Sequence, residues 1–300
     1  MLTIDPKEIA TKDLHGYLLG AIGPRPIALA STVDANGNAN LSPFSFFNVF
    51  SANPPIAIFS PARRVRNNTT KHTLENAITS REVVINIVNY NIVEQVSLSS
   101  TEYGEGVNEF VKSGLTPLDS ENIAPFRVKE SPVQMECIVK DVVALGEEGG
   151  AGNLVICEIV KIHINEAILD ANGKIDPDKI DLVGRMGGDW YCRASGEAVF
   201  KVEKPLRKLG IGVDKIPQSI RNSYILTGND LGKLGNVEKL PETEVVEAYM
   251  DNREIKDILD RCNDDEEQRV ELHTHAHELL DQGKLDEAWK TLLIDRLNRL

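Results

Sequence analysis

The sequence is poor in cysteine and aromatic residues, and it has no long apolar run. Its four cysteines form no CxxC pair, so we expect reduced thiols rather than a disulfide framework. No segment approaches the ~20 apolar residues of a membrane-spanning helix. The N-terminal stretch MLTIDPKEIATKDL also lacks the apolar centre of an export signal. We therefore expect a cytoplasmic protein without membrane segments.

The sequence has fewer basic than acidic residues, 33 Lys and Arg against 46 Asp and Glu, and its net charge is -13 at pH 7. That balance argues against a general surface for nucleic acid or anionic membrane, both of which need summed positive potential. The nucleotide fingerprints GxGxxG and GxxxxGK[ST] are missing, as is the strand-helix-strand repetition of a doubly wound fold. The sequence also shows no recognisable Ser/His/Asp arrangement for nucleophilic catalysis. A nucleotide-like ligand would have to bind in another way.

Short strands dominate the chain up to about residue 165. An Asn36-Gly37 pair after Pro26–Val33 is the strongest short hairpin signal. The pattern predicts an antiparallel barrel or sandwich with few helices. The predicted strands are residues 26–33, 39–50, 56–60, 83–88, 133–145 and 154–164, with a short helix at 73–78.

The character of the sequence changes near residue 200. Residues 205–236 are rich in Gly, Pro and turn residues, and residues 242–262 and 265–300 read as amphipathic helices, the second interrupted at 281–283. We expect one domain at residues 1–200 and a helical C-terminal extension at 201–300. An interaction arm or a tail that embraces a dimer is the interpretation that we favour for the extension.

The aromatic residues gather in one stretch. Four of the eight Phe residues lie in SPFSFFNVFSANPP, residues 42–55. Strand parity would place Phe44 and Phe46 on one face and Ser45 and Phe47 on the other. A flat, conjugated ligand would suit this mixture of apolar walls, donors and acceptors. A plain core strand at a sheet or subunit interface explains the composition equally well.

A basic segment follows, SPARRVRNNTTKHT at residues 60–73, with three Arg, one Lys and no acid. Because it leads into the predicted helix, whose first turn presents unpaired N–H groups, it suits a phosphate. A solvated basic loop is the alternative interpretation.

Other residues are weaker candidates. His273 and His277 would share a helix face, but an exposed, charged helix without a partner Glu argues against a metal site, so none is predicted. Cys137 and Cys157 lie in apolar strands and are expected in the core. The glycine-rich turn at residues 149–152 is expected to be a mobile hairpin rather than a phosphate cradle.

Five motifs, taken in their order along the chain, closely resemble those of the flavin reductase-like, FMN-binding split-barrel family, and the resemblance spans residues 10–195. They are RPIALASTVD at 25–34, NLSPFSFFN at 40–48, KHTLEN at 71–76, SPVQMEC at 131–137 and GRMGGDWY at 184–191. The chain looks like the flavoredoxin-like branch, in which FMN lies at the interface of a homodimer. One departure is His72, where a more typical sequence has Asp between the Lys and the Thr.

The resemblance implies a mainly β split barrel with short helices, and it implies residues for non-covalent FMN. Those nearest the ribityl chain are Ser31 and Thr32. Residues expected to line the ring are Ser42, Pro43, Phe44, Ser45, Phe46, Phe47 and Asn48. The phosphate would be held by Ser60, Arg63 or Arg64, Lys71 and Thr73, and the site would be closed by Arg185, Gly188 and Tyr191.

The function that the resemblance implies is hydride transfer from NADH or NADPH to the flavin and onward to an acceptor. No catalytic acid or base is needed, because the flavin carries the chemistry. Two rivals stay open: an FMN electron carrier without its own nicotinamide turnover, and a scaffold whose helical extension binds a protein partner. A flavin-dependent step on a small organic substrate is a third. Expected partners are a second copy of the chain, small-molecule flavin and nicotinamide, and a protein acceptor at the extension.

Overall fold

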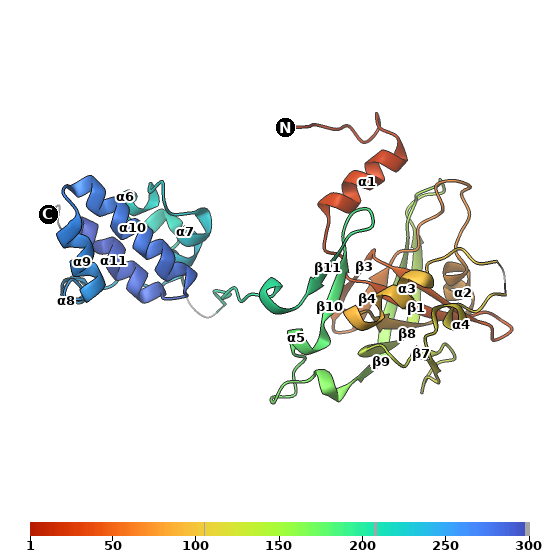
Figure 1. Ribbon diagram of the computed structural model, residues 1–300. Coiled ribbons are helices and arrows are strands. Elements are labelled where there is room, and N and C mark those ends of the chain that lie inside the picture. The colour runs from red at the N-terminus through yellow and green to blue at the C-terminus, as the bar shows by residue number, and fades with distance from the viewer. Residues whose placement is uncertain (105, 207–208, 298–300) are drawn as a thin grey trace. The chain divides into compact units, whose positions relative to one another are not determined.

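The computed structural model describes residues 1–104, 106–206 and 209–297, and it divides the chain into two units, residues 1–200 and 201–300 (Figure 1). Strands build most of the first unit, whereas the described secondary structure of the second is helical. None of the helices in the described ranges is long and apolar enough to cross a bilayer.

A seven-stranded antiparallel sheet forms the first unit, in the order β2-β1-β5-β8-β9-β4-β3. Strand β1, next to the edge strand β2, is buried along its whole length, as expected for a run of Ala, Leu, Ser, Thr and Val with apolar layers on both faces. The strands are β1 (Ala28–Val33), β2 (Ala39–Phe44), β3 (Phe47–Ala52), β4 (Pro55–Phe59), β5 (Glu82–Ile87), β8 (Val133–Ala144) and β9 (Asn153–Ile164). The predicted hairpin is confirmed, since β1 pairs with β2 around Gly37.

The sheet curls into a barrel that stays open at one seam. Its two edge strands, β2 and β3, are joined by only Ser45 and Phe46, so their ends lie within roughly 11 Å of each other. Across the seam, the Phe44 ring packs on the Phe59 ring of β4 with centroids 5.3 Å apart. The aromatic stretch of the sequence therefore crosses the opening of a split barrel, and the predicted fold class is confirmed.

Short helices cover the barrel on two sides. The interior core includes Leu74 and Ala77 of α2 (His72–Ser80). A second apolar layer joins Leu29 and Leu41 to α3 (Val93–Leu98) and α4 (Glu109–Ser113). The remaining α-helices and strands described in this unit are α1 (Thr11–Ala21), β6 (Pro117–Leu118), β7 (Arg127–Val128), α5 (Pro177–Ile180), β10 (Leu182–Arg185) and β11 (Tyr191–Ala194).

Two strand predictions have different outcomes. Cys137 and Cys157 lie in the barrel core without exposed surface, as expected, and burial raises the pKa of the Cys157 thiol to about 12. The single strand predicted over residues 39–50 is wrong, because the chain bends at Ser45 and Phe46 and continues at the opposite edge of the sheet. The alternation of side chains between the two faces of a strand therefore does not continue across that bend.

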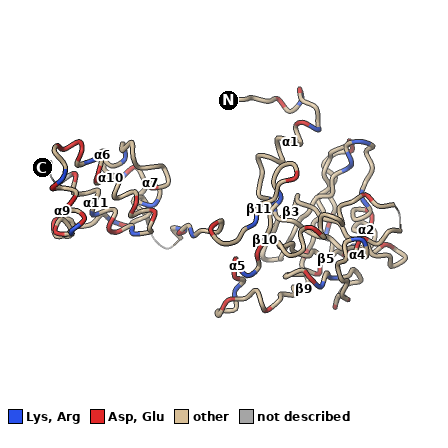
Figure 2. Tube along the Cα trace, viewed as in Figure 1, with Lys and Arg blue, Asp and Glu red and all other residues tan. Residues whose placement is uncertain are grey.

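The C-terminal unit has a core of its own. Its largest buried side chain is Trp289, whose indole N–H donates to the carbonyl oxygen of Leu234 at 3.2 Å. Charged residues of both signs are interspersed along its helices (Figure 2). The helices are α6 (Gln218–Arg221), α7 (Gly228–Leu234), α8 (Thr243–Tyr249), α9 (Arg253–Arg261), α10 (Asp265–Asp281) and α11 (Leu285–Leu297).

This core covers the apolar faces of the helices within the unit, and the interpretation of the extension as an interaction arm or a tail that embraces a dimer stays a prediction. The long helix expected over residues 242–262 is also interrupted, because Asn252 caps α9 by accepting from the N–H of Glu254 at 2.8 Å. The break between α10 and α11 agrees with the predicted interruption at 281–283.

Candidate functional site

The basic segment is an ordered loop between β4 and α2, and its first two arginines hold it in shape. Arg63 donates to the side-chain oxygen of Asn68 at 2.6 Å and to its carbonyl oxygen at 2.8 Å. Arg64 donates to Thr69 Oγ1 at 2.9 Å and forms an ion pair with Glu102 at 3.1 Å. Part of the donor capacity that we assigned to a phosphate is therefore used within the loop.

The glycine-rich turn between β8 and β9 supports this loop. The N–H of Gly150 donates to the carbonyl oxygen of Arg63 at 2.9 Å, and the Arg63 N–H donates to Ala151 at 2.8 Å. A Cβ atom on Gly149 would lie 2.9 Å from the Val65 carbonyl oxygen. The turn that we expected to be a mobile hairpin is thus a backbone support, and its glycines permit the close approach.

Lys71 differs from the two arginines. Its ammonium lies over the Phe44 ring, 4.8 Å from the centroid, and the part of the chain that the structure describes offers it no ion pair. Burial and the nearby Arg64 charge lower the pKa of Lys71, partly offset by Glu102. A desolvated ammonium near a second cation favours an anion beside it.

Hydroxyl and amide groups form a buried network next to Lys71. Asn40 Nδ2 donates to Thr73 Oγ1 at 2.9 Å and to Thr32 Oγ1 at 3.3 Å, and Asn76 donates to Thr32 at 3.1 Å. Both threonines are almost fully buried. Lys71 is the N-cap of α2, and no side chain caps this helix end, so its first-turn N–H groups point toward the same region.

The two faces of β2 divide the residues that we assigned to the flavin ring. The register pairs Thr32 with Asn40, Ala30 with Ser42 and Ala28 with Phe44, so Ser42 and Phe44 share the face of Thr32. Pro43 belongs to the opposite face. This division follows from strand parity before the bend.

After the bend the residues separate. Phe47 packs against the barrel core together with Phe44, which contradicts the parity expected for an unbroken strand. Phe46 is 40% exposed, and its ring meets that of His15 edge-on at 6.2 Å. Asn48 is exposed.

A cavity of about 670 Å³ lies on the other face of β2. The predicted residues that line it are Pro43, Ser45, Arg185 and Tyr191. The Arg185 guanidinium stacks 4.6 Å from the centre of the Tyr191 ring. The remaining walls of the cavity come mainly from α3, β10 and β11.

Arg25 connects this cavity to the seam. It is 6% exposed and donates to the carbonyl oxygens of Leu19 at 2.6 Å and Met186 at 2.8 Å, with a longer 3.4 Å contact to Ser45 Oγ. Burial and the Arg185 charge lower the pKa of Arg25. Arg25 fixes the end of α1 to the turn after β10, which positions Arg185.

The structure thus arranges most of the predicted residues in two groups. Thr32, Ser42, Phe44, Lys71 and Thr73 lie on one side of β2, with Ser60, Arg63 and Arg64 in or at the start of the adjoining loop. Pro43, Ser45, Arg185 and Tyr191 line the cavity.

Five predicted residues lie outside these groups, and two of them are Phe46 and Phe47, which lie at the bend and directly after it. Gly188 is in the β10–β11 turn at φ +59°, and Asn48 lies beyond the bend. Ser31 is on the other face of β1 from Thr32, fully buried, and its Oγ has no partner among the described residues. Sequence reasoning missed Asn40, although it lies two residues before Ser42 and so shares its face.

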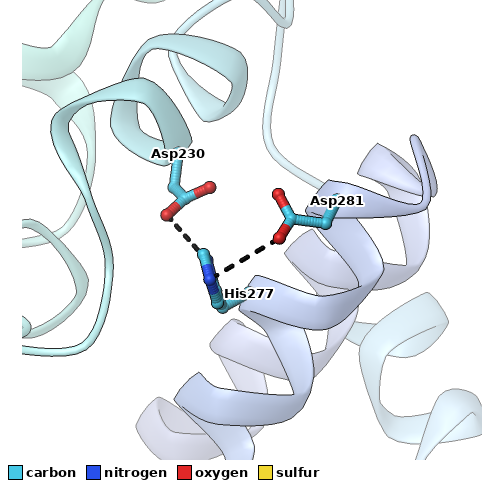
Figure 3. Close-up of side chains that lie close together, drawn as sticks. All are labelled: Asp230, His277 and Asp281. Atoms are coloured by element: carbon cyan, nitrogen blue, oxygen red, sulfur yellow. Dashed lines mark hydrogen bonds and ion pairs between the residues drawn. The ribbon is translucent and has the colours of Figure 1, made fainter. Parts of the chain in front are cut away.

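A separate cluster of titratable groups lies in the C-terminal unit (Figure 3). Asp230 of α7 accepts from His277 Nδ1 at 2.9 Å, and His277 Nε2 lies 3.6 Å from Asp281. Lys233 Nζ lies 3.4 Å from Asp281 and 3.9 Å from Asp230. Since an ammonium already supplies the cation here, the geometry favours a network that joins α7 to α10 over a metal site.

The histidines on α10 also have separate roles. His273 is buried and contacts Ser223 Oγ at 2.8 Å, whereas His277 binds Asp230. The expectation of an exposed helix at these positions is wrong, because this face of α10 packs in the unit's interior.

Comparison with known proteins gives a consistent result. The model of the flavin reductase-like domain matches residues 21–177. An uncharacterized protein of Aquifex aeolicus is 35% identical over 65% of this chain and 97% of its own length. YwrF of Bacillus subtilis, also uncharacterized, is 28% identical over 66% and 97%.

Solved structures give the same picture. Component B of nitrilotriacetate monooxygenase from Bacillus cereus is similar with a TM-score of 0.63 and 31% identity, over 67% of this chain and 98% of that one. The 2-nitrobenzoate 2-nitroreductase of Pseudomonas fluorescens has a TM-score of 0.60 and 25% identity, over 70% of this chain and 100% of that one. A protein of Shewanella frigidimarina, described as a flavin reductase with a split barrel domain, has a TM-score of 0.58 and 27% identity, over 68% of this chain and 100% of that one.

Proposed function

The chain belongs to the flavin reductase-like family, and from that premise we propose that it is an FMN-binding oxidoreductase that takes electrons from NADH or NADPH. The observation that carries this proposal is the Lys71 ammonium, partly buried, stacked on Phe44 and without an ion pair among the described residues. Such a group is suited to a phosphate oxygen.

The phosphate end of FMN fits the residues around the start of α2. We assign the phosphate to Lys71, to the Thr73 hydroxyl and to the first-turn N–H groups of α2, whose dipole adds positive potential. Arg63 and Arg64 keep the loop in shape and contribute charge at longer range. The glycine turn that supports the loop holds these groups in place.

The ring end of FMN fits the seam of the barrel. We assign the ring to the region of Phe44, Ser45 and Phe46, where apolar walls alternate with a hydroxyl and with backbone groups at the bend. Flavin supplies two-electron chemistry when it is bound. The task of the chain is to position the ring and to exclude water, which agrees with the lack of a legible catalytic dyad.

The cavity beside Arg185 is the proposed place of the second substrate. Arg185 has no ion pair among the residues that the structure describes. Its guanidinium stacks on the Tyr191 ring, and that of Arg193 stacks on the Tyr90 ring at 3.8 Å. A nicotinamide nucleotide suits these groups. An aromatic acid suits them as well, and one similar protein is a 2-nitrobenzoate nitroreductase, so direct reduction of such an acid is our second candidate function.

We propose further that the chain works as a homodimer, in the cytoplasm, where reduced nicotinamides are available. Alternate residues of β9 face the barrel core, while on its outer face Val160, Ile162 and Ile164 are 43 to 51% exposed. An apolar row on an antiparallel sheet is typical of a surface that a second copy covers.

The visible spectrum of the purified protein, with and without added FMN, tests the proposal. We expect flavin bands that bleach when NADH or NADPH is added anaerobically, and turnover when free flavin or an acceptor is present. Bound flavin with no consumption of either nicotinamide would refute the reductase and favour an electron carrier. A protein that stays colourless with FMN would refute flavin binding and favour a scaffold.

A further inference from the structure

The C-terminal unit contains a cavity that the flavin chemistry does not use. Its volume is about 390 Å³, which is within the range of small-molecule sites. The family match ends at residue 177, so family membership assigns no role to this unit. One wall is α10, and the other is formed by α6 and the turn that follows it. The lining residues are Gln218, Ser219, Asn222, Ser223, Tyr224, Ile225, Arg269, Val270 and His273.

The lining is cationic and rich in hydrogen-bonding groups. None of these nine lining residues is acidic, although residues 201–300 hold 21 Asp and Glu against 16 Lys and Arg. Amides and hydroxyls come from α6 and the following turn, and a guanidinium and an imidazole come from α10. The lining therefore carries one guanidinium and no carboxylate of its own, although Arg269 also lies in the field of the Glu266 and Asp295 carboxylates.

Arg269 keeps donors for a ligand. Its Nη2 forms an ion pair with Glu266, one turn earlier on the same helix, but Glu266 is 60% exposed, and such surface pairs are weak. A guanidinium has five N–H donors in a planar fork. It can hold a carboxylate or phosphate through two parallel hydrogen bonds while it keeps this surface contact.

His273 and Ser223 make the cavity wall rigid. Ser223 Oγ accepts from the N–H groups of Ile225 at 3.2 Å and Leu226 at 3.3 Å. The same oxygen lies 2.8 Å from His273 Nδ1, within hydrogen-bonding distance. The pair fixes the turn after α6 to α10, one helical turn from Arg269, so the cavity is preformed.

We propose that this cavity binds a small anionic molecule through a carboxylate or phosphate group held by Arg269. The site is independent of the flavin proposal, because it lies wholly within the C-terminal unit.

Calorimetric titration of the full chain, saturated with FMN so that its phosphate site is filled, tests the proposal. The probes are acetate, inorganic phosphate and neutral acetamide. We expect saturable 1:1 binding of acetate, phosphate or both and none of acetamide, and the comparison of acetate with phosphate identifies the preferred group. Arg269→Gln should weaken binding by about tenfold or more, and Arg269→Lys, which keeps the charge, should weaken it less.

Arg221→Gln is the matched control, because Arg221 is in the same unit, donates to the Asp214 carbonyl oxygen at 3.3 Å and does not line the cavity. It should leave binding unchanged. Thermal melting checks that each variant is folded. Failure of both anions to saturate, equal binding of acetamide, or an equal loss in Arg221→Gln would overturn the proposal. Each of these results leaves flavin binding untouched.

Discussion

Replacing Lys71 by Ala should weaken FMN binding without unfolding the protein. A charge-assisted hydrogen bond to a phosphate contributes about 1.5–3 kcal/mol, so we expect the FMN dissociation constant to rise by roughly 10- to 150-fold. The free protein should change little. It loses a cation–π contact of about 0.5–1 kcal/mol, but it is also relieved of a desolvated charge close to Arg64.

The measurement is a fluorescence titration of FMN together with thermal melting of the flavin-free protein. Lys112→Ala is the matched control, because its ammonium lies over the Tyr103 ring at 5.6 Å, a similar contact far from the loop in sequence. Lys71→Arg should restore most of the affinity. Equal FMN affinity in Lys71→Ala and the wild type would refute the phosphate assignment, and a large loss of melting temperature would show that Lys71 is structural.

Lys71 also predicts a pH dependence. Its pKa is lowered by burial and by Arg64, and binding requires the charged form, so FMN affinity should fall as the pH rises through a value below the usual 10.4. In Lys71→Ala this dependence should disappear. A wild-type profile that matches the variant over this range would contradict the assignment.

Three further predictions concern the rest of the molecule. A chain ending at residue 200 should fold and bind FMN with unchanged affinity, because each unit has its own core; loss of FMN absorbance from the truncated protein would contradict this. Ile162→Lys should convert the proposed dimer to a monomer in light scattering, since it places a charge on the exposed apolar row of β9; a dimer that persists in the variant would contradict the assignment of the interface to this row. Asp230→Ala should lower the free energy of unfolding by about 1–3 kcal/mol, because it removes the capping box with Thr227 and the His277 contact. Although burial alone would raise the Asp230 pKa, the hydrogen bonds from Thr227 and His277 hold it below its usual range. Asp230 therefore stabilises the fold above the unfolded pKa near 3.9 and loses that effect as the pH falls through its lower folded value. Equal denaturation midpoints of variant and wild type at pH 7 would contradict the role.

Local patterns in the sequence determined much of the fold. The Asn36-Gly37 pair specifies a hairpin because Gly37 readily adopts the positive φ that the turn requires. Alternating or continuous apolar runs specify the strands β5, β8 and β9. The ordered motifs between residues 25 and 191 were enough to suggest the family. These features depend on neighbours in the chain, so the sequence alone expresses them.

Tertiary structure decided what the aromatic stretch does. Phe44 and Phe47 face the same core because the chain bends at Ser45 and Phe46 and changes sheet edge, and no local rule predicts that the barrel opens there. The same applies to the glycine turn at residues 149–152, which supports a loop more than 80 residues earlier in the chain. In the C-terminal unit, only packing revealed that His273 is buried on Ser223 and that its helix lines a cavity. Contacts between residues far apart in the chain depend on how the elements pack, and that information is not contained in any single segment.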